Sequence, residues 1–132
     1  MSERAVRIAI IAVAAVNLAT GLFAAIAPGT FFEEIGPYGA ENGHYVGDLA
    51  AFYLAAGLGL VIAAGRPSWR VPMLAIAAVW WALHALNHLG DIGEASSDGK
   101  GIADTVLIAL GAAAIGYLAW VCARRAPQPP AG

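Results

Sequence analysis

Four apolar stretches, each with at most one charged residue, constrain the fold of this chain more than any other feature of its sequence. A helix rises about 1.5 Å per residue, so about 20 residues cross a hydrocarbon layer of about 30 Å. The composition agrees, because only 12% of the 132 residues are charged, against about 25% in soluble domains. The sequence therefore predicts four transmembrane helices, over residues 6–27, 45–65, 71–89 and 102–122.

The connections between these stretches are short and leave no room for a separate soluble domain. We therefore expect one all-α, antiparallel four-helix bundle over residues 1–126, with an up-down-up-down topology. The first stretch is longer than the apolar core of a usual signal peptide, and Pro28 follows it directly, so we expect it to be retained. Three prolines, Pro127, Pro129 and Pro130, predict a short tail at 127–132 that cannot continue a helix.

The charged residues form two groups that predict the orientation of the bundle. Six arginines lie before the first stretch, between the second and third, or after the fourth, and an up-down bundle places all of them on one side. Eight of the nine acidic residues lie on the other side, where Lys100 is the single cation. By the positive-inside rule, we expect a protein of the cytoplasmic membrane with both termini in the cytoplasm.

The third apolar stretch ends with three groups able to bind a metal, His84, His88 and Asp91, at positions i, i+4 and i+7. At about 100° per residue, these side chains fall on one face of a helix. Such spacing arises often in helices by chance. The triplet therefore needs support from the rest of the bundle before it indicates a site.

Bundle topology supplies that support, because it brings further donors to the same end. His44 and Asp48, four residues apart, open the second stretch, and Asp104 opens the fourth. In an up-down bundle these residues and the triplet all reach the extracytoplasmic side. We therefore expect one layer of nitrogen and oxygen donors, shared by three helices.

Neutral imidazoles and carboxylates are ligands for zinc, iron, manganese or copper(II). Zinc is the first choice, and the candidate ligands are His44, Asp48, His84, His88 and Asp104. Asp91 would then act as a general base or orient a histidine. The alternative is a hydrogen-bonded network of His and Asp pairs that holds the helices together without a metal.

Two neighbouring features bear on this layer. Trp80 and Trp81 lie within a turn of His84 and would either wall an apolar pocket below the layer or pack in the core. Thr30 and Glu33 have the spacing of a capping box, which predicts a short helix after the first stretch. That helix would cover the layer or anchor the chain at the membrane interface. The loop at 93–101 is expected to be flexible and to take no part in the chemistry.

Two motifs carry a resemblance to a known group of proteins: the run 42–57, with its histidine and aspartate four residues apart, and the His-x3-His-x2-Asp motif at 84–91. With its hydropathy, the chain resembles small uncharacterised bacterial four-helix membrane proteins that are distantly similar to the DoxX-like families. The resemblance implies four helices and a paired His/Asp motif on the second and third. DoxX-like relatives are linked to quinone and sulfur redox chemistry, whereas this chain has a single cysteine, Cys122, and no cysteine pair.

Three functions of different classes follow from these observations. The first is metal-dependent chemistry on a lipid or another amphiphile at the outer leaflet, using the His/Asp layer. The second is a non-enzymatic accessory subunit that docks onto a larger membrane complex or onto a second copy of itself through small residues. The third is a small proton-linked carrier, although Asn17 is the only polar residue that would extend a path towards the cytoplasm. The lipid bilayer is the expected partner in each case, and no nucleic-acid partner is predicted.

Overall fold

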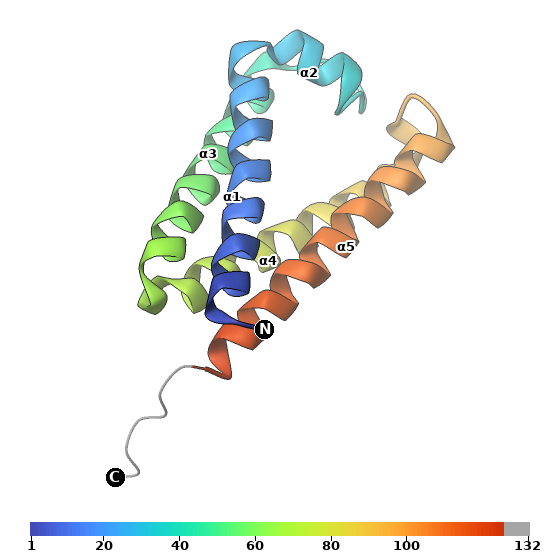
Figure 1. Cartoon of the computed structure of the whole chain (residues 1–132). Helices are drawn as coiled ribbons and strands as arrows, with labels where there is room; N and C mark the ends of the chain where they lie inside the picture. The colour runs from blue at the N-terminus through green and yellow to red at the C-terminus, as the bar shows by residue number, and fades with distance from the viewer. Residues whose placement is uncertain (126–132) are drawn as a thin grey trace.

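The computed structural model describes residues 1–125, and four long helices dominate it (Figure 1). They are α1 (Glu3–Ile26), α3 (Gly43–Gly65), α4 (Pro67–Gly90) and α5 (Asp98–Ala123). The short helix α2 (Pro28–Glu34) follows α1, and a 3-10 turn, η1 (Ile92–Glu94), precedes α5. All four long helices are long and apolar enough to cross a membrane. The prediction of an all-α chain with four such helices is confirmed over these residues, and the predicted tail at 127–132 lies outside them.

Polar caps start three of the long helices a few residues ahead of the apolar stretches. The Ser2 hydroxyl accepts a hydrogen bond from the Ala5 amide, and the Ser97 hydroxyl accepts one from the Lys100 amide. The side-chain oxygen of Asn42 accepts from two amides in the first turn of α3. These caps satisfy N–H groups that have no partner inside the helix. Hydropathy does not register them, because they bury no apolar surface.

Helix α2 does not begin with the capping box predicted at Thr30 and Glu33. It begins at Pro28 with Ala27 as its N-cap, and no side chain caps it. Proline is favoured in a first turn, because it lacks the N–H that would need a partner there. Thr30 therefore lies inside the helix, and the predicted capping box is wrong, although the predicted short helix is present.

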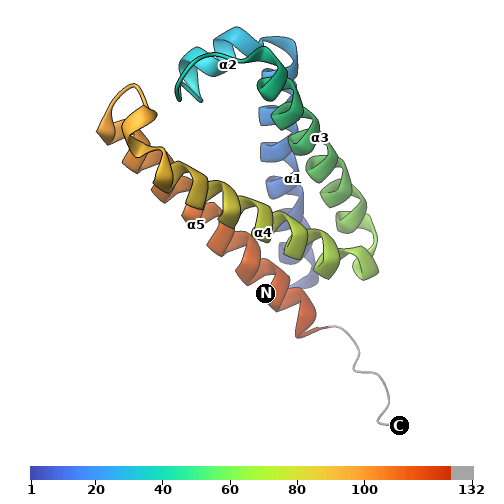
Figure 2. The ribbon, with the colours of Figure 1, turned by 180° about the vertical axis from the view of Figure 1, so that it is seen from behind.

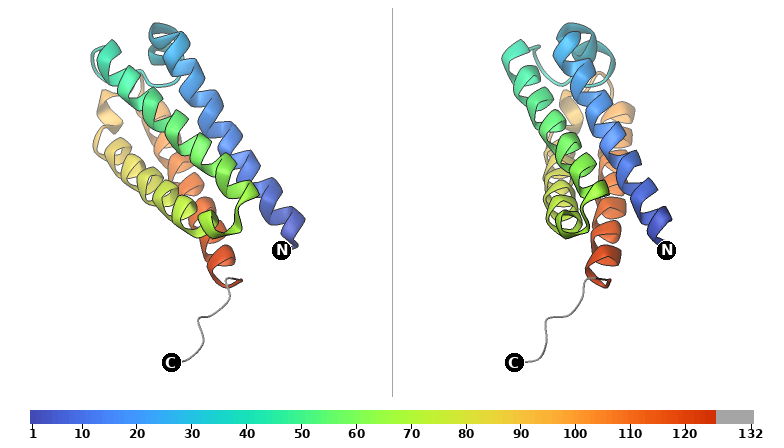
Figure 3. Two further views of the ribbon diagram at one scale, coloured as in Figure 1. Left: turned by 90° about the vertical axis from the view of Figure 1, so that its left-hand side faces the viewer. Right: turned by 60° about the vertical axis from the view of Figure 1, so that its left-hand side comes forward.

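The long helices form two hairpins that meet at one end and separate at the other (Figures 1 and 2). Helix α1 packs along α3 (Figure 3), and α4 packs along α5, with far fewer contacts between the hairpins. The main apolar core lies at the end where they meet, which we call the closed end, and its largest side chains include Val6, Ile10, Leu60, Leu74 and Ile115. At the other end, which we call the open end, a smaller apolar cluster joins α2 to α1 and α3.

The outer faces of the bundle are apolar as well. Large aliphatic side chains on every long helix are about half exposed or more, among them Ile8, Leu58, Ile76 and Leu107. A soluble domain does not leave so much large apolar surface in water. The surface therefore agrees with the hydropathy of the four helices, and lipid is the solvent that it fits.

Two glycines allow α1 and α3 to approach closely. A Cβ atom on Gly21 would lie 3.0 Å from the backbone nitrogen of Leu54. A Cβ atom on Gly57 would lie 2.6 Å from Cγ of Leu18. Small residues at such positions are how helices associate in lipid, where no hydrophobic effect drives them together. The first hairpin therefore depends on the absence of two side chains.

Arg70 holds the closed end together. Its side chain is 9% exposed and forms an ion pair with Glu3 at the start of α1, at 2.6 Å. The same guanidinium donates hydrogen bonds to the carbonyl oxygens of Ala63 (3.3 Å) and Ala64 (3.5 Å), in the last turn of α3. These carbonyls have no partner within their own helix. Arg70 thus caps α3 from α4 and ties both helices to α1.

Candidate functional site

A cavity of about 640 Å³ lies at the open end, between the separated ends of the two hairpins. Helix α2 and the loop that follows it extend from the first hairpin towards the second and cover this space (Figure 2). We call the cavity the cleft. It lies at the end of the bundle away from the main apolar core. Its volume is typical of sites for small molecules.

One part of the cleft is apolar and aromatic. Phe31 of α2, Tyr53 of α3 and Trp81 of α4 line it, together with Leu107 and Ile108 of α5. The sequence predicted that Trp80 and Trp81 would either wall a pocket or pack against other side chains, and each of the two tryptophans takes one of these roles. Trp81 walls the cleft. Trp80, by contrast, packs against other rings and lies stacked on Phe52 with 4.4 Å between the ring centroids.

The other part of the cleft is polar, and two histidines of α4 lie at its centre. His84 and His88 both line the cleft, and their ring centroids are 4.6 Å apart. Their i, i+4 spacing places them on one face, as predicted. His84 is stacked on Trp80 at 5.0 Å, and His88 meets Tyr38 edge to face at 4.5 Å. Aromatic contacts therefore hold both imidazoles in place.

His88 has an unused hydrogen-bonding atom. Its Nδ1 is buried and has no hydrogen-bond partner within residues 1–125. Burying a polar atom without a partner is costly, and such atoms in folded proteins are nearly always satisfied by protein, water or ligand. A bound molecule or water in the cleft is the natural partner for this nitrogen.

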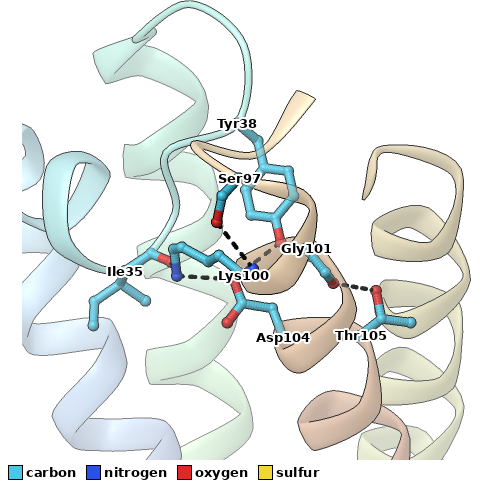
Figure 4. Close-up of polar contacts among 7 residues, drawn as sticks. All are labelled: Ile35, Tyr38, Ser97, Lys100, Gly101, Asp104 and Thr105. Atoms are coloured by element: carbon cyan, nitrogen blue, oxygen red, sulfur yellow. Dashed lines mark hydrogen bonds and ion pairs between the residues drawn. The ribbon is translucent and has the colours of Figure 1, made fainter. Parts of the chain in front are cut away.

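A set of hydrogen bonds holds the loop after α2 against the start of α5 (Figure 4). The Tyr38 hydroxyl donates to Oδ2 of Asp104 at 3.0 Å. Lys100 Nζ lies 2.9 Å from the same oxygen and donates to the carbonyl oxygen of Ile35 at 3.1 Å. The Gly39 amide also donates to the Glu94 carbonyl, at 3.2 Å. We call the three side chains Tyr38, Lys100 and Asp104 the latch, because they connect the cover of the cleft to the second hairpin.

The electrostatics of the latch keep Tyr38 as a donor. Burial raises the pKa of the Tyr38 hydroxyl to about 12, and its hydrogen bond to Asp104 acts in the same direction. Both effects disfavour the phenolate. Tyr38 is therefore protonated at neutral pH, and Asp104 can accept from Tyr38 and Lys100 together.

Asp91 and Asp104 both line the cleft, but neither is bonded to a histidine. Oδ2 of Asp91 accepts a hydrogen bond from the Asn87 side chain at 2.9 Å. Asp104 is occupied by the latch. Lys100 balances the charge of Asp104, whereas no cation is paired with Asp91 within residues 1–125. The polar part of the cleft therefore carries a net negative charge. The predicted role of Asp91 as a base or orienter of a histidine is not seen as a direct contact and stays a prediction.

His44 and Asp48 lie at the same end of the bundle but outside the cleft. Nε2 of His44 is 3.6 Å from Oδ2 of Asp48, and the two side chains are 81% and 69% exposed. The reason is helical phase. The buried face of α3 here is formed by Val46, Ala50 and Tyr53, and at about 100° per residue positions 44 and 48 point to the opposite face.

The predicted layer therefore divides into two parts, with His84, His88, Asp91 and Asp104 at the cleft and the His44 and Asp48 pair apart from them. Within residues 1–125, no three His, Cys, Asp or Glu side chains are placed so that they could share a metal ion. The expectation of one site shared by all the histidines is not met. Binding of zinc, or of iron, manganese or copper(II), stays a prediction. His84 and His88, whose rings are neighbours in the cleft, are the two residues with which such a site would begin.

Sequence reasoning missed two residues of the site, Tyr38 and Lys100, and it named Asp104 as a metal ligand rather than as the acceptor for these two side chains. Tyr38 stood in a loop with no signal of its own. Lys100 and Asp104 are four residues apart at the start of a helix, a spacing that stabilises opposite charges and offered a usable signal. The loop expected to be flexible at 93–101 instead contains η1 and the first turn of α5.

The latch leads to a first testable prediction. Replacing Asp104 by alanine removes the acceptor for both Tyr38 and Lys100, so the cover should open more often. We expect amide hydrogen exchange in the segment 36–41 to rise by about tenfold, corresponding to about 1.4 kcal/mol for the lost contacts. Asp48→Ala is the matched control, because it removes an exposed acid at the same end outside the latch. Equal exchange in the two variants would show that the latch does not hold the cover.

Comparisons with known proteins add no relative to this geometry. Scans of protein-family models, of curated proteins and of solved structures returned no match. The resemblance to DoxX-like proteins accordingly stays a prediction, and the residues of the cleft themselves are the basis for a functional proposal.

Proposed function

We propose that this chain is a multi-pass protein of the cytoplasmic membrane that binds an amphiphile, a lipid or lipid-like molecule, in the cleft. Both termini would lie in the cytoplasm and the cleft would open towards the extracytoplasmic side. The arginines at the closed end and the acids at the open end support this orientation through the positive-inside rule. Four helices of membrane-spanning length support the location.

The single observation that carries the proposal is the composition of the cleft. Trp81, Leu107 and Ile108 offer an apolar wall, and His84 and His88 offer polar groups beside it. A ligand that satisfies both must have an apolar part and a hydrogen-bonding part. The unpartnered Nδ1 of His88 would supply a contact for the polar part once the imidazole turns towards the cleft. Because the outer surface is apolar as well, such a molecule reaches the protein from the surrounding lipid.

The negative charge of the cleft limits which polar head group the ligand can carry. Asp91 and Asp104 line the cleft, and Lys100 compensates only one of them. A phosphate or carboxylate group would therefore meet net negative charge in a site of low dielectric, which is unfavourable. A hydroxyl, amide or amine head group fits better. The aromatic rings around the histidines add a favourable surface for a cationic head.

Copurification tests this proposal. The protein would be extracted directly from membranes into polymer-bounded lipid discs, and the small molecules that stay bound would be identified by mass spectrometry. The His84→Ala/His88→Ala double variant should lose the bound amphiphile, because it loses the polar contacts and the stacking on Trp80. His44→Ala should retain it, because His44 is exposed outside the cleft.

The outcomes separate the alternatives. An amphiphile enriched with the wild type and His44→Ala but absent from the double variant supports the proposal. Identical lipid content in all three samples contradicts it. Elemental analysis of the same samples tests whether the protein binds a metal. Stoichiometric zinc that disappears only in the double variant would favour metal-dependent chemistry at His84 and His88. An accessory subunit would keep its partner protein in all three samples.

A further inference from the structure

A second cavity, of about 460 Å³, lies at the closed end of the bundle, away from the cleft. The first turns of α1 and α4 and the last turn of α3 form its walls. Among residues 1–125, three arginines line it, Arg4, Arg7 and Arg70, and Glu3 is the only acidic residue that does. This concentration of positive charge in a concave site is independent of the cleft and its proposed function.

The three arginines have different surroundings. Arg70 is buried and is engaged by Glu3 and by the carbonyls that end α3. Arg4 and Arg7 are exposed, lie three residues apart on one face of α1, and form no ion pair or side-chain hydrogen bond within residues 1–125. Two guanidinium groups with all their donors free thus face the same cavity.

The backbone adds to this positive potential. Helices α1 and α4 both begin at the cavity, at Glu3 and Pro67, and a helix N-terminus carries partial positive charge. The C-terminus of α3 would oppose them with its carbonyl groups, but Arg70 covers the carbonyls of Ala63 and Ala64. The net field in the cavity therefore favours an anion.

We propose that this cavity binds a phosphate group, with Arg4 and Arg7 as its ligands, while Arg70 covers the carbonyl groups that would oppose an anion. Planar guanidinium groups match the geometry of phosphate oxygens and donate to them in pairs. Arg4 and Arg7 lie in the first two turns of a helix of membrane-spanning length, which in a bilayer would place them at the depth of the lipid head groups. The phosphate would belong to an anionic phospholipid of the adjacent leaflet or to inorganic phosphate.

Native mass spectrometry of the protein in lipid discs tests the site. Discs with equal amounts of phosphatidylglycerol and phosphatidylcholine provide an anionic and a zwitterionic lipid in competition. We expect the wild type to retain phosphatidylglycerol preferentially, and Arg4→Gln/Arg7→Gln to lower the retained amount by about tenfold. Arg66→Gln/Arg124→Gln is the matched control, because it removes the same charge from the same end at exposed arginines outside the cavity.

A second arm adds inorganic phosphate to the discs. Loss of bound phosphatidylglycerol on addition of millimolar phosphate, with phosphate retained in its place, supports the same site with free phosphate as its ligand. Retention of the lipid supports the phospholipid. Equal losses in the two double variants would overturn the proposal in favour of general surface attraction, as would a wild type without lipid preference. Both variants keep Arg70 and its structural contacts, and size-exclusion elution verifies that they fold.

Discussion

Replacing Gly57 by alanine is expected to lower the free energy of unfolding by about 2 kcal/mol. The added Cβ would lie 2.6 Å from Cγ of Leu18 and 3.1 Å from its backbone nitrogen. The leucine side chain can rotate away, but the backbone of α1 can move only if the helices separate. Because α1 and α3 form the main contact of the first hairpin, this separation would weaken packing along the whole pair.

The control for Gly57 lies on the same helix. Gly47 faces open space, with no atom within 4 Å of a Cβ placed there. Gly47→Ala should leave stability unchanged or raise it by up to about 1 kcal/mol, because alanine favours helices over glycine. Unfolding in mixed micelles, followed by tryptophan fluorescence as the denaturing detergent is increased, measures both. If the two variants lose stability equally, close packing at Gly57 is not the cause.

Replacing Arg70 by alanine is expected to cost about 2 kcal/mol, because it leaves two buried carbonyls without their donor. Three helices lose their connection at the closed end, since the guanidinium contacts Glu3 of α1 and the last turn of α3 from its own helix α4. The same detergent titration measures the loss. Arg70→Lys should recover only part of it, because one ammonium group cannot reproduce the fork of the guanidinium.

Glu3→Gln separates the two contacts of Arg70. The Glu3 side chain is 66% exposed, so water screens its ion pair with Arg70. We expect this variant to lose much less stability than Arg70→Ala. A loss as large as that of Arg70→Ala would show that the ion pair, rather than the capping of α3, makes Arg70 important. These variants therefore measure how Arg70 contributes to stability, and none of them changes a residue of the cleft.

The helices themselves could be predicted from the sequence, because an apolar stretch of membrane-spanning length has few alternative structures. The shared face of His84 and His88 could also be predicted, because it depends only on helical geometry within α4. The place of His44 could not be predicted in the same way. Its direction depends on how α3 is rotated against α1, which the packing of Gly57 and Tyr53 decides and hydropathy does not register.

The latch and the arginine cap show a second limit. Tyr38 and Asp104 are 66 residues apart, and no local pattern connects a loop tyrosine with the first turns of a later helix. Arg70 was counted only as a positive charge that orients the bundle, yet the structure buries it against the end of α3. Contacts between distant segments depend on the angle between the hairpins, and that angle is a property of the assembled fold.

The unequal packing of the hairpins also gives the molecule the shape of a wedge. Its helices are close together at one end and apart at the other (Figure 1), so in a bilayer the protein would take up more area in one leaflet than in the other. Lipids that crowd the wider leaflet press the free ends of the hairpins together. Because the core that resists this motion lies at the narrow end, the width of the cleft is expected to depend on the lateral pressure of the bilayer.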